Sequence, residues 1–356
     1  MSEIKVNSIK GVGASTAAIT VNNTDGTCTA NITNNLSNRN LIINGAMQVA
    51  QRGTSSTTSG YATVDRYSNE YAGADEAPTQ AQVDVASGTT PYTLGFRKAI
   101  KITNGNQTSG AGTADIAVVK QIIEAQNIAQ SGWNYLSASS NITLSFWVKS
   151  SVAQNFYGYI RSVSGTVRSH PYETGSLTAD TWTKITKTFS GDSNITINND
   201  NSVEFNFYLV LFYGTGLTAS GVSLTAWNTY DVTALMPDNT STWYTTNDAT
   251  LEITGVQLEV GSQATPFEHR SYGEELSLCQ RYYQTGFAKL YNSNQPIMVM
   301  SQNFMPEMRA APTITGEQFG SETNAIWSSI EVTTKRACSF YKNGEICQQW
   351  NCDAEL

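Results

Sequence analysis

Residues 203–214 read VEFNFYLVLFYG, and this stretch does most to indicate the fold. In an extended chain, successive side chains point to opposite faces. One face of this stretch is wholly apolar: Val203, Phe205, Phe207, Leu209 and Leu211. Tyr208, Val210 and Phe212 make the other face increasingly apolar as well. The pattern predicts a central β-strand that is covered on both faces.

Strand signals continue on both sides of this stretch, from about residue 41 to residue 268. In ITLSFWVKS (142–150), apolar and polar residues alternate, which predicts a strand buried on one face. In LEITGVQLEVG (251–261), the apolar positions change phase at Gly255, which predicts a β-bulge. The segment 117–130 fits either a helix or an edge strand. Turn-rich segments separate the strands, so the sequence favours a mainly β fold, a β-sandwich or jelly roll.

Composition excludes several classes of partner. Lys and Arg number 21 against 29 Asp and Glu, a net charge of −8, so we expect no nucleic acid partner. No run reaches the roughly eighteen apolar residues of a membrane helix, and residues 1–10 lack the apolar core of a secretory signal. We therefore expect synthesis in a cytoplasm and no membrane insertion. The five cysteines, none in a C-x-x-C pair, are expected to be reduced thiols.

The chain divides into four parts. Residues 1–40 are small and polar and carry too little apolar side chain to form a core alone. Residues 41–270 hold the predicted jelly-roll sandwich, residues 271–285 a connecting helix, and residues 286–356 a small C-terminal β domain.

The connecting helix has a clear start signal. In SYGEELSLCQRYY, Ser271 is the expected N-cap, and Glu274 follows three residues later, as in a capping box. Leucine, cysteine and tyrosine side chains then follow at helical spacing. The pattern predicts a helix that packs on one face.

The segment NLIINGAMQVAQRGT (40–54), followed by VDRY (64–67), resembles the start of a jelly-roll module of phage tail fibres and related virion proteins. That family's pattern is N-x-x-x-N-G-x-M-x-x-x-Q-R-G and then D-R-W/Y. The chain also carries LSFWVKS, ITGVQLEVGSQATPFEHRSYGEELSLCQRYYQ, MRAAPT and a final DAEL in the family's order. The resemblance covers roughly residues 41–356, and residues 1–40 match only loosely a virion-attachment start of the MSEIKVN type.

The resemblance implies structural roles for five motif residues, namely Asn44, Gly45, Arg52, Asp65 and Arg66. Arg66 beside Asp65 would anchor the returning chain through ionic hydrogen bonds. The family also implies a homotrimer in the virion, bound to other virion proteins, with residues 1–40 serving attachment or oligomerisation.

Standard catalytic motifs are missing from the sequence. His269 is expected to orient the helix, and His170 to lie in a loop. There is no H-E-x-x-H, G-x-S-x-G or phosphate-binding loop. Aspartates in turn-rich sequence are expected to cap turns rather than act as a glycosidase pair: Asp192, Asp200, Asp231, Asp238 and Asp248. We expect no cofactor, and a loop-bound calcium ion stays an open question.

Aromatic residues give the best indication of binding. Residues 214–249 are loop-like yet carry Trp227, Tyr230, Trp243 and Tyr244. Flat rings beside Asn and Asp groups form sugar-binding platforms. The alternative is that these rings fill the end of the sandwich or a subunit contact.

These observations predict a phage virion protein, a tail fibre or tail-associated adhesin, that binds host surface polysaccharide without catalysis. Weak contacts on several subunits would combine into firm attachment. The alternatives are a capsid decoration or head-fibre protein and a polysaccharide depolymerase.

Overall fold

The computed structural model describes residues 6–10, 12–13, 18–21, 24, 28–30, 38–290, 298–318, 329–342 and 346–356. Strands dominate this part of the chain. Its helices are short: α1 (Thr90–Thr93), α2 (Ala125–Ala129) and α3 (Tyr272–Gln280). In the described residues, no helix has the length and apolar character to cross a membrane.

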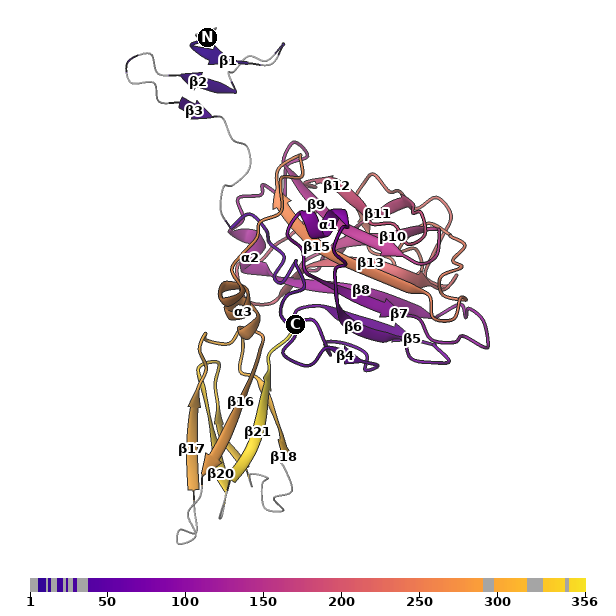
Figure 1. Cartoon of the computed structure of the whole chain (residues 1–356). Coiled ribbons are helices and arrows are strands. Elements are labelled where there is room, and N and C mark those ends of the chain that lie inside the picture. Colours follow the sequence, from indigo (N-terminus) through magenta and orange to yellow (C-terminus); the bar gives the residue numbers. More distant parts are fainter. Residues whose placement is uncertain are drawn as a thin grey trace.

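Two six-stranded antiparallel sheets form a sandwich (Figure 1). The first sheet has the order β14 (Asn228–Thr229), β11 (Arg168–Ser176), β10 (Asn155–Ser162), β13 (Val203–Tyr213), β8 (Ile116–Glu124) and β5 (Ser68–Ala72). The second has the order β12 (Thr183–Ser190), β9 (Asn141–Ser150), β15 (Thr250–Val260), β7 (Lys98–Thr103), β6 (Thr79–Asp84) and β4 (Ser55–Ser56). The chain crosses between the sheets repeatedly, and the mainly β jelly-roll sandwich predicted from the sequence is confirmed.

The core lies between the two sheets, as the alternation of apolar residues predicts. β13 is a central strand between β10 and β8, and its alternate side chains, among them Phe205 and Phe207, are buried inside the sandwich. Phe146 of β9 meets Phe207 edge to face, with ring centroids 6.0 Å apart. Burying each such side chain stabilises the fold by roughly 1.5–3 kcal/mol.

The β-bulge predicted at Gly255 is present. Pairing between β9 and β15 shifts register between Thr254 and Gln257. Gly255 has φ +65°, and a Cβ there would lie 2.6 Å from Cζ of Phe96. The bulge needs glycine both for this backbone conformation and for the space.

The segment 117–130, which fits either a helix or an edge strand, combines a strand and a helix. Most of it lies in β8, which is not an edge strand because it pairs with both β13 and β5. The chain then turns into α2, whose Ile128 joins the sandwich core.

The C-terminal part forms a second, smaller pair of sheets, seen at the lower end of Figure 1. One has the order β16 (Tyr283–Leu290), β21 (Ile346–Asp353) and β18 (Thr313–Gln318). The other has the order β17 (Met298–Asn303), β20 (Ala337–Lys342) and β19 (Ser329–Thr333). Met308, Cys338, Trp350 and Cys352 belong to its core. We call these six strands and their connections the C-terminal sandwich.

The helix before this sandwich is shorter than the predicted 271–285. Ser271 is the N-cap, and its Oγ accepts a hydrogen bond from the Glu274 amide at 3.3 Å. The helix ends at Gln280, and Tyr283 already begins β16. Tyrosine continues a helical pattern in the sequence, but here it starts a strand because that strand pairs with β21.

The N-terminal region contains a small antiparallel sheet of β1 (Ser8–Ile9), β2 (Ile19–Val21) and β3 (Cys28–Ala30). Much of the predicted attachment segment 1–40 lies outside the described residues. Three cysteines, Cys279, Cys338 and Cys352, are buried free thiols.

Candidate functional site

Three of the four rings predicted as a sugar platform belong to the core. Trp243 is fully buried, and Tyr244 stacks on Phe212 with ring centroids 4.1 Å apart. Trp227 is also buried, and its indole donates to the Ser190 carbonyl at 2.7 Å. These three rings fill the sandwich, the alternative that the sequence also allows, so their faces are not available to a ligand.

Tyr230 is placed differently, because it lines a hollow of about 210 Å³ over the outer face of the first sheet. We call this the tyrosine hollow. Its aromatic and charged lining residues are Glu70, Tyr159, Arg161, Tyr208, Tyr213 and Tyr230. The hollow lies between β5, β8, β10 and β13 and the loop that follows β13.

Strand register builds the floor of the tyrosine hollow. Tyr159 of β10 lies opposite Tyr208 of β13, and Tyr208 lies opposite Lys120 of β8. The rings of Tyr159 and Tyr208 are stacked, with centroids 4.3 Å apart and planes 19° from parallel, and both are buried, so that Tyr230 is the more accessible ring of the hollow. Because alternate residues of these strands fill the core, the outward positions form one continuous row across the sheet.

Arg161 connects the sheet to the loop. Its guanidinium carbon lies 5.3 Å from the ring centroid of Tyr208 and 5.1 Å from that of Tyr230, within cation–π range. In the amide orientation that satisfies both groups, the Asn206 side-chain oxygen accepts from Nη2 of Arg161 at 2.8 Å. The arginine is therefore held beside the hollow by the two rings and by the amide.

The polar groups of the hollow can both donate and accept hydrogen bonds. The hydroxyl oxygens of Tyr159 and Tyr213 lie 3.0 Å apart. Burial raises the pKa of both phenols, so they stay neutral near physiological pH. The Glu70 carboxylate lines the hollow and lies 2.6 Å from Nζ of Lys120, which stands outside the lining. A ligand with several hydroxyl groups finds suitable partners there.

Apolar residues of the loop after β13 complete the hollow. Leu217 and Leu235 line it, and the Leu235 amide donates to the Leu217 carbonyl at 3.0 Å. Val232, also in the lining, is 53% exposed. Such a site, apolar with a few convergent polar groups, suits a small ligand that has one apolar face and several hydroxyls.

Sequence reasoning found Tyr230 and missed Tyr159, Arg161 and Tyr208. A signal was present, because NFYGYIRS (155–162) puts Tyr159 and Arg161 on the same side of a strand, opposite the core residues. The tertiary fold decides which strands are neighbours. Tyr159 and Tyr208 come together only because β10 pairs with β13.

The turn aspartates have the capping roles expected of them where the contacts are defined. The Asp200 carboxylate accepts from Ser202, and that of Asp231 from Thr233. These hydrogen bonds lower the pKa of Asp200 and of Asp231, whereas a glycosidase acid needs a raised pKa. Of the others, Asp192 accepts from the Asn194 amide, Asp238 from the Thr218 hydroxyl, and Asp248 has φ +57°.

The two histidines also have structural surroundings. His170 is a buried residue of strand β11 rather than a loop residue, packed edge to face against Phe189 with ring centroids 4.8 Å apart. His269 lies in the connector before α3, and its Nε2 is 2.9 Å from the Leu94 carbonyl oxygen. Within the described residues, no three His, Cys, Asp or Glu side chains come together as a metal site.

The motif residues before β5 hold a loop in place. Asn44 has φ +59°, and its side-chain amide donates to the carbonyls of Val49 and Asp65 at 2.8 and 2.9 Å. A Cβ on Gly45 would lie 2.2 Å from the Val256 carbonyl oxygen, so only glycine fits against β15. These contacts position Arg52 and Arg66.

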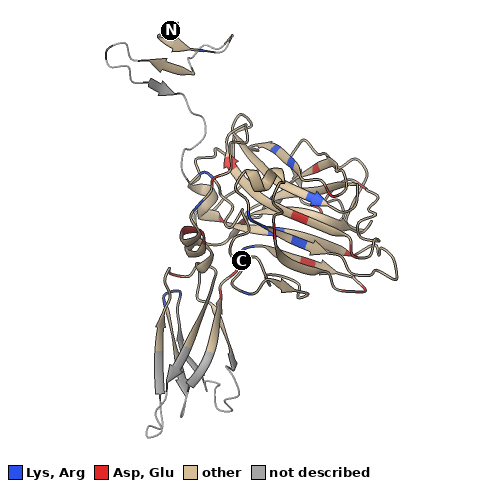
Figure 2. Ribbon diagram, in the orientation of Figure 1, with Lys and Arg blue, Asp and Glu red and all other residues tan. Residues whose placement is uncertain are grey.

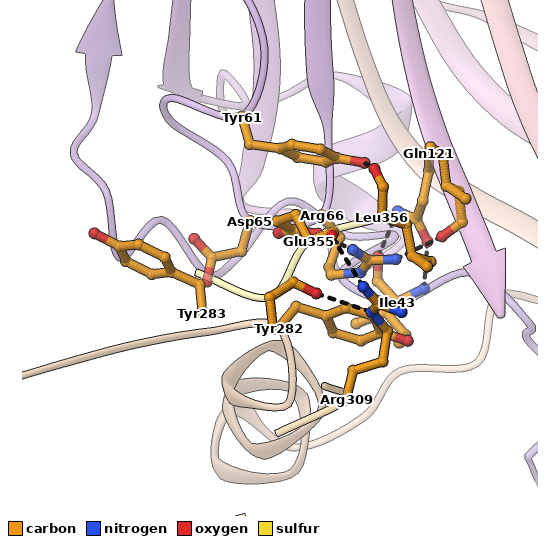
Figure 3. A network of polar contacts seen from close by, with 12 residues as sticks. Ile43, Tyr61, Asp65, Arg66, Gln121, Tyr282, Tyr283, Arg309, Glu355 and Leu356 are labelled. Carbon is orange, nitrogen blue, oxygen red and sulfur yellow. Dashed lines mark hydrogen bonds and ion pairs between the residues drawn. The ribbon is translucent and has the colours of Figure 1, made fainter. Parts of the chain in front are cut away.

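Both arginines bind the end of the C-terminal sandwich, and Figure 3 shows Arg66 beside Glu355. Arg66, which is 1% exposed, forms an ion pair with Glu355, and its guanidinium carbon lies 3.4 Å from the ring centroid of Tyr282. Arg52 lies 3.0 Å from the Asp353 carboxylate. The ionic anchor expected at Arg66 is present, and its partner is Glu355, almost three hundred residues further along the chain.

Two further segments of the resemblance, MRAAPT and SYGEELSLCQRYYQ, meet at the same place. Arg309 of the MRAAPT segment donates to the Ala354 carbonyl at 2.9 Å, and its amide donates to the Arg281 carbonyl at 2.7 Å. Arg281 in turn binds Glu124. The residues of these segments therefore form one junction between the two sandwiches, together with Arg52, Arg66 and the final DAEL, which supports structural roles for them.

No family model matches the chain, and no curated protein sequence matches it. Among solved structures it is similar to the enzymatically active domain of tailspike protein 4 of bacteriophage CBA120, at a TM-score of 0.33 and 13% identity over 62% of this chain and 21% of that one. It is also similar to the N-terminal cellulose-binding domain of Cellulomonas fimi β-1,4-glucanase C (TM-score 0.28, 10% identity, 61% of this chain and 99% of that one). The xylan-binding CBM22-1 domain of Paenibacillus barcinonensis Xyn10C gives a TM-score of 0.30 and 7% identity over 63% of this chain and 96% of that one. These likenesses are distant.

Proposed function

We propose that this chain is a non-catalytic glycan-binding protein of a phage virion, and that the tyrosine hollow holds the sugar. The observation that carries the sugar site is the half-buried ring of Tyr230, which lines the hollow beside Arg161, over a floor that includes the stacked rings of Tyr159 and Tyr208. The Tyr230 ring offers a flat apolar surface to the C–H face of a sugar, while guanidinium and phenol groups bind its hydroxyls.

The virion part of the proposal is supported by the ordered sequence motifs. Several of these motifs, with Arg52, Arg66, Arg281, Arg309 and Glu355, meet at the junction between the two sandwiches. We propose a tail fibre or tail-associated adhesin, assembled as a homotrimer, that binds host surface polysaccharide. Several weak sites on one particle would raise the effective affinity without any new contact.

The test of the sugar site is binding of purified protein to susceptible cells and to their isolated polysaccharide. Tyr230→Ala should weaken this binding by about three- to tenfold, since a stacked ring contributes roughly 0.5–1.5 kcal/mol. Tyr272→Ala is the matched control, because Tyr272 is 57% exposed on α3, away from the hollow lining. Equal binding by both variants and the unchanged protein would contradict the proposed site.

Location and catalysis are tested separately. Gold-labelled antibodies against the chain should mark the tail of intact virions, whereas label over the head would support a capsid decoration protein instead. Incubation with host polysaccharide should change neither its viscosity nor its reducing ends. A fall in viscosity would show a depolymerase.

A further inference from the structure

We propose that a second hollow, on the outer face of the other sheet, binds a carboxylated sugar unit such as a uronic acid. The hollow has a volume of about 420 Å³. Its principal lining residues are Phe96, Trp147, Lys184, Thr265, Phe267 and His269. We call it the Trp147 hollow.

The aromatic wall of the Trp147 hollow is preassembled. Phe96, Phe267 and His269 contact one another, and the Phe96 and Phe267 rings meet edge to face with centroids 4.9 Å apart. Nε2 of His269 is 2.9 Å from the Leu94 carbonyl oxygen, which ties the connector before α3 to the segment after α1. A wall that is already ordered lowers the entropic cost of binding.

The opposite rim is fixed by a buried carboxylate. Glu259 accepts hydrogen bonds from the Thr265 amide at 2.8 Å and from the Thr265 hydroxyl at 2.6 Å. Glu259 is itself fully buried in β15, so this carboxylate holds the rim and does not face the hollow. Gly255, at the β-bulge, also lines the hollow.

Trp147 provides the flat surface. It projects from β9 on the face opposite the core residues Phe146 and Val148, and it is only half-buried. An indole ring in a concave, largely apolar site is suited to stack on the C–H face of a sugar.

The charge of the lining selects the ligand class. Lys184 of β12 lies directly opposite Trp147 in the β9–β12 ladder and is exposed. Directly opposite residues have Cβ atoms about 4.5–5.5 Å apart, so a ring stacked on Trp147 brings a substituent within reach of Nζ. None of the residues described as lining this hollow is acidic, although the whole chain carries a net charge of −8. A carboxylate on the sugar would supply the missing partner.

This site is independent of the tyrosine hollow, because the two hollows lie on different sheets of the sandwich. The tyrosine hollow contains Glu70, which already pairs with Lys120. The Trp147 hollow has an exposed lysine and no acidic lining. The second site therefore prefers an anionic sugar, and the proposal stands even if the first site binds nothing.

The test follows the indole N–H signal of Trp147 by NMR in protein labelled with ¹⁵N-tryptophan, with the signal assigned from a Trp147→Phe variant. The probes are methyl glucuronide and methyl glucoside, each titrated to about 50 mM, since single sugar contacts are of millimolar class. Methyl glucuronide should shift this signal at lower concentration than methyl glucoside. Lys184→Gln should weaken glucuronide binding by about two- to fivefold and remove the preference.

Lys101→Gln is the matched control for charge, because Lys101 lies on β7, in the same sheet but outside the hollow. It should leave the glucuronide titration unchanged. Tyr230→Ala should also leave it unchanged, which separates this site from the tyrosine hollow. No shift of the Trp147 signal with either sugar, or equal glucuronide binding by Lys184→Gln and the unchanged protein, would overturn the proposal.

Discussion

Glu124 shows what a single buried residue does in this protein. At the end of β8, its carboxylate accepts hydrogen bonds from Nε and Nη2 of Arg281 at 3.0 and 2.9 Å and from the Tyr282 hydroxyl at 2.6 Å. Burial alone would raise the pKa of Glu124, but these donors outweigh it, and the pKa is lowered. The ion pair thus fixes the end of α3 on the sandwich.

We predict that Glu124→Gln lowers the free energy of unfolding by about 1–3 kcal/mol near pH 7, because Arg281 loses its anionic partner. The folded-state pKa of Glu124 lies below its unfolded value of about 4.3, so its contribution is complete above that pH and is lost as pH falls through the folded value. The difference in the free energy of unfolding between the variant and the unchanged protein should therefore shrink below about pH 4. Denaturant unfolding at several pH values measures it, and a difference that stays constant down to about pH 3 would contradict the assignment.

Residue type and local sequence do not predict the exposure of the aromatic side chains correctly. Trp243 and Tyr244 lie in sequence that reads as loop, yet the loop folds back and both side chains are buried. Tyr208, by contrast, lies in a strand that is predicted to be covered on both faces, and its ring is indeed buried on the outer face. Polarity of the neighbours predicts exposure on average, whereas the path of a long loop decides it for each ring.

At the scale of elements, the strands follow directly from the alternation of side chains. β9 and β13 bury the residues that the period of two assigns to the core, and β15 breaks its pairing at the predicted glycine. Ion pairs between neighbouring outward positions, such as Lys149 with Glu252 and Lys120 with Glu70, intersperse the charges on the outer faces, as Figure 2 shows for the sandwich as a whole.

We predict that Gly255→Ala destabilises the protein more than Gly221→Ala does. Both glycines have positive φ, but an added Cβ at Gly255 meets the Phe96 ring, whereas at Gly221 it meets nothing within 4 Å. Backbone strain alone should lower the free energy of unfolding by about 1 kcal/mol, and overpacking against Phe96 should add about 1–3 kcal/mol. Thermal unfolding of the two variants gives the comparison. Equal losses would mean that the Phe96 ring moves aside freely.

At the scale of the whole molecule, the C-terminal sandwich is held by a charged junction that lies largely in the protein interior. Arg66 and Glu355 are both nearly inaccessible to solvent, and Arg52 contacts Asp353 and the ring of Tyr283, whose centroid is 3.7 Å from its guanidinium carbon. Removing one partner of a buried ion pair is strongly destabilising, because it leaves an unpaired charge in the interior. The junction therefore fixes which surfaces of the two sandwiches meet.

We predict that Arg66→Gln weakens this junction by about 3–5 kcal/mol, because Glu355 is left buried without its nearest cation. Hydrogen exchange should increase at β21 and at the end of α3, while the centre of β13 stays protected. Lys335→Gln is the control, since Lys335 is 55% exposed and its pair with Glu307 should contribute at most about 1 kcal/mol. Unchanged exchange at β21 in the Arg66→Gln variant would show that the junction is held by other contacts.

The sequence by itself determined the mainly β fold, the central strand, the glycine bulge and the N-cap of α3, because each depends on residues that are close in the chain. It also contained the motif residues around Arg52 and Arg66 and indicated an ionic anchor at Arg66, but it did not give the partner. Only the tertiary structure decided that Arg66 pairs with Glu355, that Trp243 is buried, and that Tyr159, Tyr208 and Lys120 form one row. Such contacts join residues tens to hundreds of positions apart, and the pairing of strands that creates them depends on packing across the whole sandwich rather than on any local pattern.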